Sequence, residues 1–132
     1  MDKTALKKIA ADAIEASKDR LITIGRDLYA MPEPGFREFK TSAYVERVLT
    51  SLGLKVENSI AITGLRAVAK GKSHNSNIGI MGELDSLLMP GHPRADQDTG
   101  AAHACGHHAQ LTMMLGTAFG LVGSDLIKEL DG

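Results

Sequence analysis

The chain has 132 residues, a formal net charge of −1 at pH 7, 43% hydrophobic residues and only 4% aromatic residues. Acidic and basic residues are mixed along the sequence, so we expect no nucleic-acid or polyanion partner. No apolar run approaches the length that spans a membrane, and no membrane association is expected. This length and apolar fraction allow one globular domain with a modest core.

The first half of the chain predicts helices. Residues 2–31 read as one or two amphipathic helices, because an apolar residue recurs every three or four positions. Pro32 and Pro34 end this region. Residues 38–52 repeat the helical period, and Gly53 follows where a glycine commonly ends a helix. The expected role of both apolar stripes is core packing.

Short strands are predicted over 54–57, 65–70 and 78–82. The third has the composition of a strand that is buried on both faces between closely packed helices, because it is apolar and contains glycine. Together with the helices, these strands predict an α/β fold. The pattern alone does not predict the order of the strands.

Two carboxylates follow the third strand. Glu83 and Asp85 are two residues apart, so both side chains lie on the same side of an extended backbone. Because active sites of open α/β sheets gather at the carboxyl ends of strands, this pair is a site candidate. Glu83 is equally compatible with a solvated loop residue. Asp85 is favoured, since a carboxylate behind a metal-ligating histidine orients its ring.

A long loop is predicted over 86–102, between these carboxylates and the next motif. Loops of this length in a compact domain are usually functional or disordered. We expect solvation to account for its polar residues His92, Asp96 and Asp98. His74, in an earlier polar turn, is not expected to be a ligand.

The sequence Ala-His-Ala-Cys-Gly-His-His at 102–108 is the strongest functional signal. It holds the only cysteine, Cys105, separated from His107 by Gly106 alone. A thiolate and an imidazole this close suit one divalent cation. A helical apolar stripe from Leu111 to Val122 places the motif at a loop-to-helix junction. A lone cysteine is most often a small buried apolar residue, but the upstream carboxylates favour a metal site.

These motifs resemble those of the dinuclear metal-dependent amidohydrolases, which belong with the co-catalytic metallopeptidases. The resemblance rests on Gly-Glu-Leu-Asp at 82–85, on Thr-Gly-Ala-Ala-His-Ala-Cys-Gly-His at 99–107, and on Arg26 to Phe36. It extends from about Leu21 to Val122. The family includes aminoacylases, hippurate hydrolases, auxin-conjugate hydrolases and p-aminobenzoyl-glutamate hydrolases.

The resemblance implies roles for individual residues. Cys105 and His107 would be metal ligands, and Asp85 an acid near the metals that supports a ligand. Glu83 occupies a position that holds a histidine ligand in many sister enzymes. His108 replaces the aspartate or asparagine that usually follows Cys-Gly-His, so it is a possible additional site residue. His103, in the same motif, is another.

The resemblance also implies a fold and an activity. The fold would be a three-layer α/β/α arrangement with a mixed sheet. The complete enzyme would hold two divalent ions, zinc, manganese or cobalt, and hydrolyse amide bonds of N-acyl amino acids or small aryl-amide conjugates. It would be a homodimer when full length. A single cysteine forms no internal disulfide, which predicts a reducing, cytoplasmic compartment.

Family enzymes carry a Glu-Glu pair and further histidine ligands after the motif, and no residue that follows the motif in this chain matches them. Residues 1–132 are therefore expected to be the N-terminal part of a catalytic domain, without the general base and without the dimerisation domain. We expect this chain alone to be inactive and do not assign Glu129 as a base. The alternative is a non-catalytic metal-binding or assembly module. A thiol-redox role for Cys105 is less favoured, since no second cysteine is present.

Overall fold

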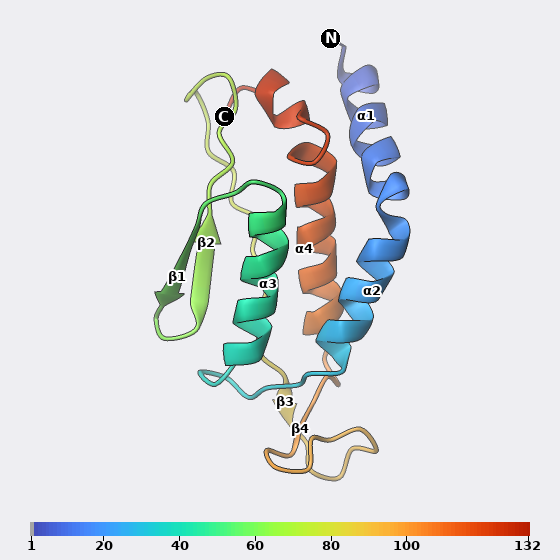
Figure 1. The fold of residues 1–132 in the computed structure, drawn as a ribbon, viewed down its shortest axis with the longest axis vertical. Helices are drawn as coiled ribbons and strands as arrows, with labels where there is room; N and C mark the ends of the chain where they lie inside the picture. Colours follow the sequence, from blue (N-terminus) through green and yellow to red (C-terminus); the bar gives the residue numbers. More distant parts are fainter. Residues whose placement is uncertain (1) are drawn as a thin grey trace.

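The body of the molecule is a row of α-helices, seen side by side in Figure 1. The computed structural model describes residues 2–132. In chain order the helices are α1 (Lys3–Ala16), α2 (Lys18–Tyr29), α3 (Phe39–Ser51) and α4 (His107–Leu121), followed by the short 3-10 helix η1 (Leu126–Glu129). Helix α4 packs against the other three and lies between the α1–α2 pair and α3.

The predicted N-terminal helical region is two helices that meet at Ser17. Asp2 caps the first of them, since its carboxylate accepts a hydrogen bond of 2.8 Å from the Ala5 backbone N–H. The second helix buries Ile24 and Leu28 and ends at Tyr29, ahead of the two prolines. The predicted helix boundaries at 31 and at 38–52 are therefore close to those observed.

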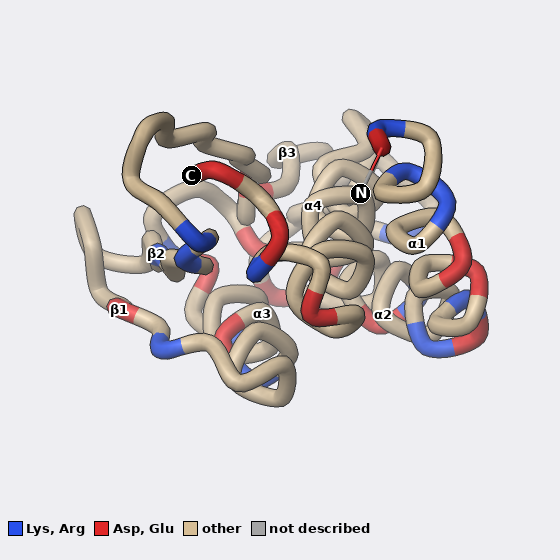
Figure 2. The backbone as a smooth tube through the Cα atoms, turned by 90° about the horizontal axis from the view of Figure 1, so that it is seen from above, with Lys and Arg blue, Asp and Glu red and all other residues tan. Residues whose placement is uncertain are grey.

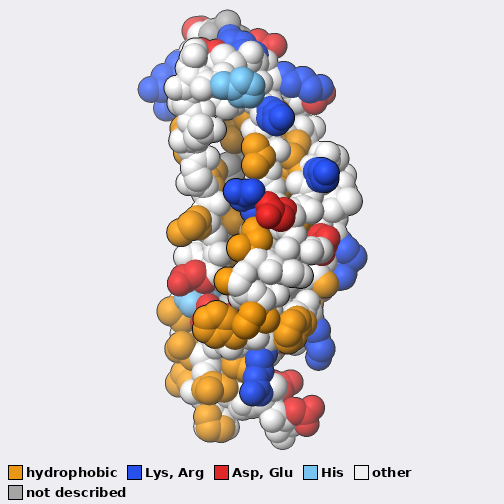
Figure 3. Space-filling view, turned by 90° about the vertical axis from the view of Figure 1, so that its left-hand side faces the viewer, with side chains coloured by type: hydrophobic (Ala, Val, Ile, Leu, Met, Phe, Trp, Pro, Cys, Tyr) orange, Lys and Arg blue, Asp and Glu red, His pale blue; other side chains and the backbone are white. Residues whose placement is uncertain are grey.

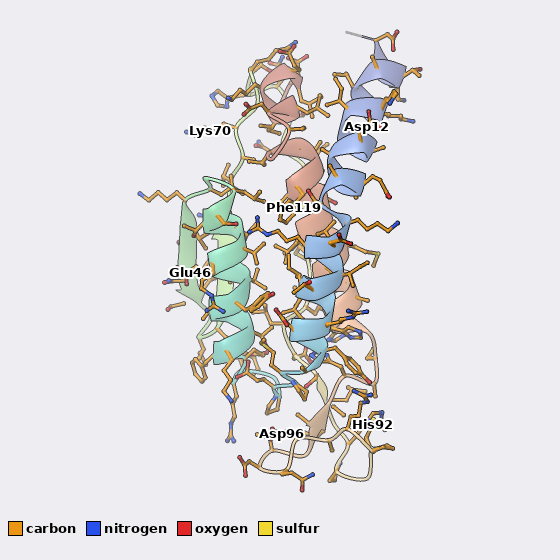
Figure 4. All side chains as sticks on the ribbon, turned by 45° about the vertical axis from the view of Figure 1, so that its right-hand side comes forward. Asp12, Glu46, Lys70, His92, Asp96 and Phe119 are labelled. Atoms are coloured by element: carbon orange, nitrogen blue, oxygen red, sulfur yellow. The ribbon has the colours of Figure 1, made fainter. Side chains whose placement is uncertain are left out.

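Helix α4 supplies the centre of the hydrophobic core. Its residues Leu111, Leu115 and Phe119 are buried, and the ring of Phe119 lies beneath the Arg20 guanidinium at 4.9 Å. Figure 4 shows Phe119 in the middle of the helix assembly. The buried apolar cluster comprises Ile24, Leu28, Val45, Val48, Leu49, Leu111, Leu115 and Phe119. Because α4 begins at His107, this core also fixes the start of the candidate site.

The strands form two small antiparallel pairs. β1 (Val56–Ile60) and β2 (Gly64–Ala67) make a hairpin beside α3, while β3 (Leu87–Leu88) pairs with β4 (Ala101–Ala102). The second pair closes the base of the predicted 86–102 loop, which is therefore not structureless throughout. Residues 2–132 therefore form two separate two-stranded sheets, whereas the resemblance implies one mixed sheet.

The predicted doubly buried strand over 78–82 is wrong for this chain. Ile78 is 87% exposed and Met81 is 88% exposed, and the segment belongs to no strand. The physical reason is the absence, among the described residues, of any strand running alongside it. A sheet segment that lacks neighbours has neither a ladder of hydrogen bonds nor a covered face.

Charged residues of both signs lie along the helices. Lys and Arg are interspersed with Asp and Glu along α1 and α2 in Figure 2. Figure 3 shows hydrophobic side chains at the surface on the side of the β1–β2 hairpin, where Ile62 and Val68 are 59% and 60% exposed. Within residues 2–132, none of the helices has the length and apolarity needed to cross a bilayer.

The contact between α2 and α3 includes one strong polar bond. The Tyr44 hydroxyl donates to the Asp27 carboxylate at 2.7 Å. Burial, and then the hydrogen bond and charge of Asp27, raise the pKa of Tyr44 to about 12. A raised pKa means that the folded state holds the proton more tightly than the unfolded state. Its contribution to stability is therefore complete below about pH 10 and is lost as the pH rises towards 12.

We expect Tyr44→Phe to lower the free energy of unfolding by about 1 kcal/mol at pH 7, because Asp27 loses its neutral donor. The difference from the parent chain should vanish between pH 10 and pH 12. Urea unfolding at a series of pH values measures it. Tyr29→Phe is the matched control, since the Tyr29 ring packs against the His108 ring and phenylalanine keeps that ring contact. Equal losses in both variants would contradict this prediction.

Candidate metal centre

The first residue of α4, His107, lies at the centre of the site. Its Nδ1 is 3.0 Å from the Asp85 carboxylate and 2.9 Å from the Asp85 carbonyl oxygen. Its Nε2 is 3.2 Å from the Glu83 carboxylate, and the side chain is only 15% exposed. When Nδ1 carries the proton and donates it to Asp85, the lone pair lies on Nε2. In that tautomer the unprotonated nitrogen of His107 faces Glu83.

Gly106 explains why the motif has a glycine between its two candidate ligands. Its φ is 103°, in the left-handed region that side-chain-bearing residues avoid. The chain therefore turns at Gly106, which leaves Cys105 outside the helix with an exposed thiol, while His107 begins the helix. Among the described residues, no group of three or more His, Cys, Asp or Glu side chains could hold a metal ion. Residues 2–132 thus present no complete set of metal ligands.

Gln110 holds Glu83 against the helix and was not predicted as a site residue. The Glu83 backbone N–H donates to the Gln110 side-chain oxygen at 2.6 Å, and the Gln110 amide donates back to the Glu83 carboxylate at 3.2 Å. Gln110 follows His107 by three residues, so both side chains lie on the same face of α4. That spacing is the signal by which the sequence could have identified it.

A second unpredicted connection fixes Asp85 from the other side. The backbone N–H and the hydroxyl of Ser86 both donate to the Glu33 carbonyl oxygen, at 2.8 and 2.9 Å. The carboxylate of Glu33 accepts the Lys40 and Thr41 backbone N–H groups and the Thr41 hydroxyl. Glu33 therefore caps the start of α3 and also anchors the residue after Asp85. Its position just before a predicted helix was the available signal.

We expect Glu33→Ala to lower the free energy of unfolding by about 0.5–2 kcal/mol, the usual cost of losing a helix cap. Glu33→Gln retains one acceptor oxygen and should lose less. Urea unfolding followed by circular dichroism measures both. Glu57→Ala serves as the control, because the Glu57 carboxylate makes only an exposed ion pair with Arg66. A Glu33→Ala variant no less stable than Glu57→Ala would refute the cap.

His103 and His108 do not join His107 in the site. They pack on Tyr29 instead: the His108 ring centroid is 4.8 Å from that of Tyr29 and 5.1 Å from that of His103. Neither ring nitrogen of His103 has a hydrogen-bond partner among the described residues, nor has Nδ1 of His108. His103 is 7% exposed. His107 and His108 are neighbours in sequence, yet they lie on different faces of α4.

The environment of these two histidines favours their neutral form. Burial, followed by the charge of His108, lowers the pKa of His103, while the nearby Leu28 carbonyl opposes the shift without reaching hydrogen-bond geometry. Burial also lowers the pKa of His108. Both rings are therefore neutral at pH 7 and act as packing groups.

An apolar groove lies on the surface near the start of α4. It has a volume of about 690 Å³ and runs between the α1–α2 pair and α4, with apolar walls that include Leu21 and Met113. His108 and Tyr29 line it, but none of Glu83, Asp85, Cys105 and His107 does. The groove is thus separate from the His107 site.

The polar residues of the 86–102 loop also lie apart from the site. Figure 4 shows His92 and Asp96 on the loop that extends beyond the helices. The Asp96 carboxylate accepts hydrogen bonds from the Asp98 and Thr99 backbone N–H groups and from the Thr99 hydroxyl. These bonds, with those from Thr99 first, lower the pKa of Asp96. Asp96 therefore organises a turn of the loop.

Comparison with known proteins gives relatives but no match to a family model. The chain is 41% identical over 117 residues to a probable hydrolase of Synechocystis sp., covering 86% of this chain and 29% of that protein. It is 33% identical over 118 residues to an N-acetyldiaminopimelate deacetylase of Bacillus pumilus, covering 86% of this chain and 31% of the relative. An N-acetyl-L-cysteine deacetylase of Bacillus subtilis is 33% identical to it over 113 residues, which cover 83% of this chain and 26% of that protein.

A solved structure gives the same result. The fold matches that of a dinuclear metal binding peptidase of the M20 family from Bacillus subtilis with a TM-score of 0.76 and 31% sequence identity. The match covers 89% of this chain and 34% of that chain. This chain thus spans about a third or less of each of these relatives. In sequence and in structure the chain therefore resembles one part of these hydrolases and deacetylases and of an M20-family dinuclear metal binding peptidase.

Proposed function

We propose that this chain carries one side of the active site of a metal-dependent hydrolase that cleaves the amide bond of N-acyl amino acids. The observation that carries the proposal is the geometry of His107, whose Nδ1 contacts Asp85 while its Nε2 faces Glu83 beside the Cys105 turn. The substrate class rests on two relatives that are named deacetylases of N-acetyldiaminopimelate and N-acetyl-L-cysteine. Small aryl-amide conjugates are the second substrate class of the proposal.

The donor atoms fit part of a divalent-metal site. Cys105 offers a soft sulfur and His107 a nitrogen, a combination that suits zinc, while Glu83 and Asp85 add oxygen atoms that manganese or cobalt also accept. In the proposal Cys105 and His107 bind an ion directly. Two ions are expected, because the structural relative is dinuclear. The remaining ligands and the general base lie outside residues 1–132.

In the proposal the residues of this chain orient the metal ligands and adjust their basicity, and they do not transfer the proton. Asp85 fixes the tautomer and the ring plane of His107 through Nδ1 and makes Nε2 a better donor of electron density. Gln110 restrains Glu83, so the carboxylate stays near Nε2. When bound, divalent ions supply an acidified water and polarise the scissile carbonyl.

The domain assignment is part of the same proposal. Residues 1–132 would be the N-terminal part of a catalytic domain that reaches its three-layer α/β/α form and mixed sheet with further sequence. In this proposal the dimerisation domain belongs to sequence outside residues 1–132, and the complete enzyme would be a cytoplasmic homodimer. On its own the 132-residue chain would hydrolyse no amide, because the proposal assigns the general base and the remaining ligands to sequence outside it.

A hybrid protein tests the function. In the hybrid, this chain replaces the superimposed third of the Bacillus subtilis M20 peptidase. We expect the hybrid to release amino acid from N-acetyl amino acids in a reaction that chelators stop, and the 132-residue chain to release none. A folded, metal-loaded hybrid without any amidase activity would contradict the proposal and favour a non-catalytic metal-binding or assembly module. Preference for p-aminobenzoyl-glutamate over N-acetyl amino acids would instead assign the aryl-amide class.

A further inference from the structure

The Nδ1 atom of His107 faces two oxygen atoms of the same residue. The Asp85 carboxylate lies 3.0 Å from it, and the Asp85 main-chain carbonyl oxygen lies 2.9 Å from it. Both oxygens can only accept, so a neutral ring that bonds to them carries its proton on Nδ1. The Asp85 side chain is 33% exposed, and water therefore competes for its carboxylate. The carbonyl instead belongs to a peptide unit shared with the buried residue Ser86.

The other edge of this peptide unit is fixed by Glu33. The Ser86 N–H donates to the Glu33 carbonyl oxygen at 2.8 Å, and the Ser86 hydroxyl donates to the same oxygen at 2.9 Å. The peptide bond between Asp85 and Ser86 is trans, so its C=O and N–H point in opposite directions. Because the Glu33 carbonyl holds the N–H, the C=O of Asp85 is aimed at His107.

Two prolines restrict the residue that holds the peptide unit. Pro32 and Pro34 flank Glu33, and a residue that precedes proline is biased towards extended conformations. The Glu33 carboxylate is bound as well, since it accepts the backbone N–H and the hydroxyl of Thr41 at the start of α3. The Glu33 carbonyl is therefore positioned by its own segment of the chain, independently of its contact with Ser86.

We propose that the Asp85–Ser86 peptide unit is a second acceptor that orients His107, with Ser86 and Glu33 as positioning residues. The main-chain carbonyl keeps the proton on Nδ1 and the lone pair on Nε2 even when the Asp85 carboxylate is lost or turns to another partner. The carboxylate contributes negative charge. The loss of metal affinity or turnover expected without that carboxylate then reports its charge and not a change of tautomer.

The consequence for metal binding rests on the proposed function, but the tautomer of His107 is a property of this chain alone. Nitrogen NMR measures the tautomer without metal or substrate, because protonated and unprotonated ring nitrogens have different chemical shifts. The tautomer of His107 and the activity of the hybrid can therefore fail independently.

Nitrogen NMR of the neutral ring in four forms of the metal-free chain tests the proposal. All four carry Glu83→Ala, which removes the carboxylate that lies 3.2 Å from Nε2 and competes for the proton. The first form has no other change, and the second adds Asp85→Ala. The third and fourth add Ser86→Ala or Ser86→Pro to the second. We expect Nδ1–H to be the major tautomer of His107 in the first three forms. In the fourth, the ratio of Nδ1–H to Nε2–H should fall about fivefold, the effect of losing one typical hydrogen bond.

The chain offers two controls. Ser86→Ala is matched to Ser86→Pro, because it removes the hydroxyl but keeps the backbone N–H that proline lacks. His92 is the internal control for the spectra. Its Nδ1 accepts the Arg94 backbone N–H at 3.1 Å, so its proton lies on Nε2, the opposite arrangement to His107. The tautomer of His92 should be the same in all four forms.

Two results would overturn the proposal. Nε2–H as the major tautomer in the second form would show that the carboxylate alone holds the proton on Nδ1. An unchanged ratio in the fourth form would show that the bond to Glu33 has no part in it.

If circular dichroism shows that the fourth form is unfolded, amide exchange of Ser86 in the second form decides instead. The reference is Gly79, whose amide makes no backbone hydrogen bond with the described residues. Exchange of the Ser86 amide about tenfold slower than that of Gly79 would support the bond to Glu33. Equal exchange rates would refute it.

Discussion

Leu115→Ala should lower the free energy of unfolding by about 2–5 kcal/mol, the range for truncating a fully buried leucine. Leu115 is 0% exposed and lies in α4, which packs against α1, α2 and α3. The loss combines the transfer of the side chain out of water with the cavity that remains. Against the usual 5–15 kcal/mol of a domain, this change is large. Urea unfolding monitored by circular dichroism measures it.

Met113→Ala is the matched control for the core. Met113 lies on the same helix and is 68% exposed, so the change should stay within about 0.5 kcal/mol of the parent. Similar losses in the two variants would mean that α4 is not the centre of the core. The prediction bears on the site because α4 begins at His107 and carries Gln110.

Asp85→Asn in the hybrid should reduce metal affinity or turnover by about 10–100-fold, the usual cost of losing a partner behind a metal-ligating histidine. An amide retains the size of the side chain but lacks the negative charge that makes His107 a stronger ligand. The fold should be unchanged, since Asp85 lies outside the buried cluster. Steady-state kinetics at a series of metal concentrations separates loss of affinity from loss of turnover.

Asp98→Asn is the control for that measurement, because Asp98 is an exposed residue of the 86–102 loop. It should leave both metal dependence and turnover unchanged. If Asp85→Asn and Asp98→Asn had the same kinetics, Asp85 would be a solvated residue. Its contact with His107 would then contribute nothing to metal binding or turnover.

Local sequence signals predicted the helices and the junction. The 3.6-residue period predicted the ends of α2 and α3 to within a few residues. The Cys-Gly-His turn lies at the start of α4, as predicted. These features depend on the chain's own period, on prolines that stop a helix and on a glycine with positive φ. The contact between Asp85 and His107 also follows from local order, since a segment end and a helix start meet there.

Features that depend on distant partners were not predictable in the same way. The 78–82 segment has the composition of a buried strand, but burial requires neighbours that residues 2–132 do not provide. Helical spacing alone separates His108 from His107, since consecutive helix residues do not share a face. The packing of His108 on Tyr29 and His103, in contrast, depends on tertiary contacts that the spacing does not predict. Glu33 and Ser86 meet across 53 positions in the sequence. Such contacts are fixed by tertiary packing.

The metal content of the hybrid tests the central claim most directly, because it depends on Cys105 and His107 without requiring turnover. Elemental analysis should find two divalent ions in the parent hybrid, as in a dinuclear relative. Cys105→Ala and His107→Ala should each lose at least one, and loading with cobalt should give a thiolate absorption band that disappears in Cys105→Ala. His74→Ala, which changes an exposed histidine, should keep both ions. Unchanged metal content in Cys105→Ala and His107→Ala would contradict the account.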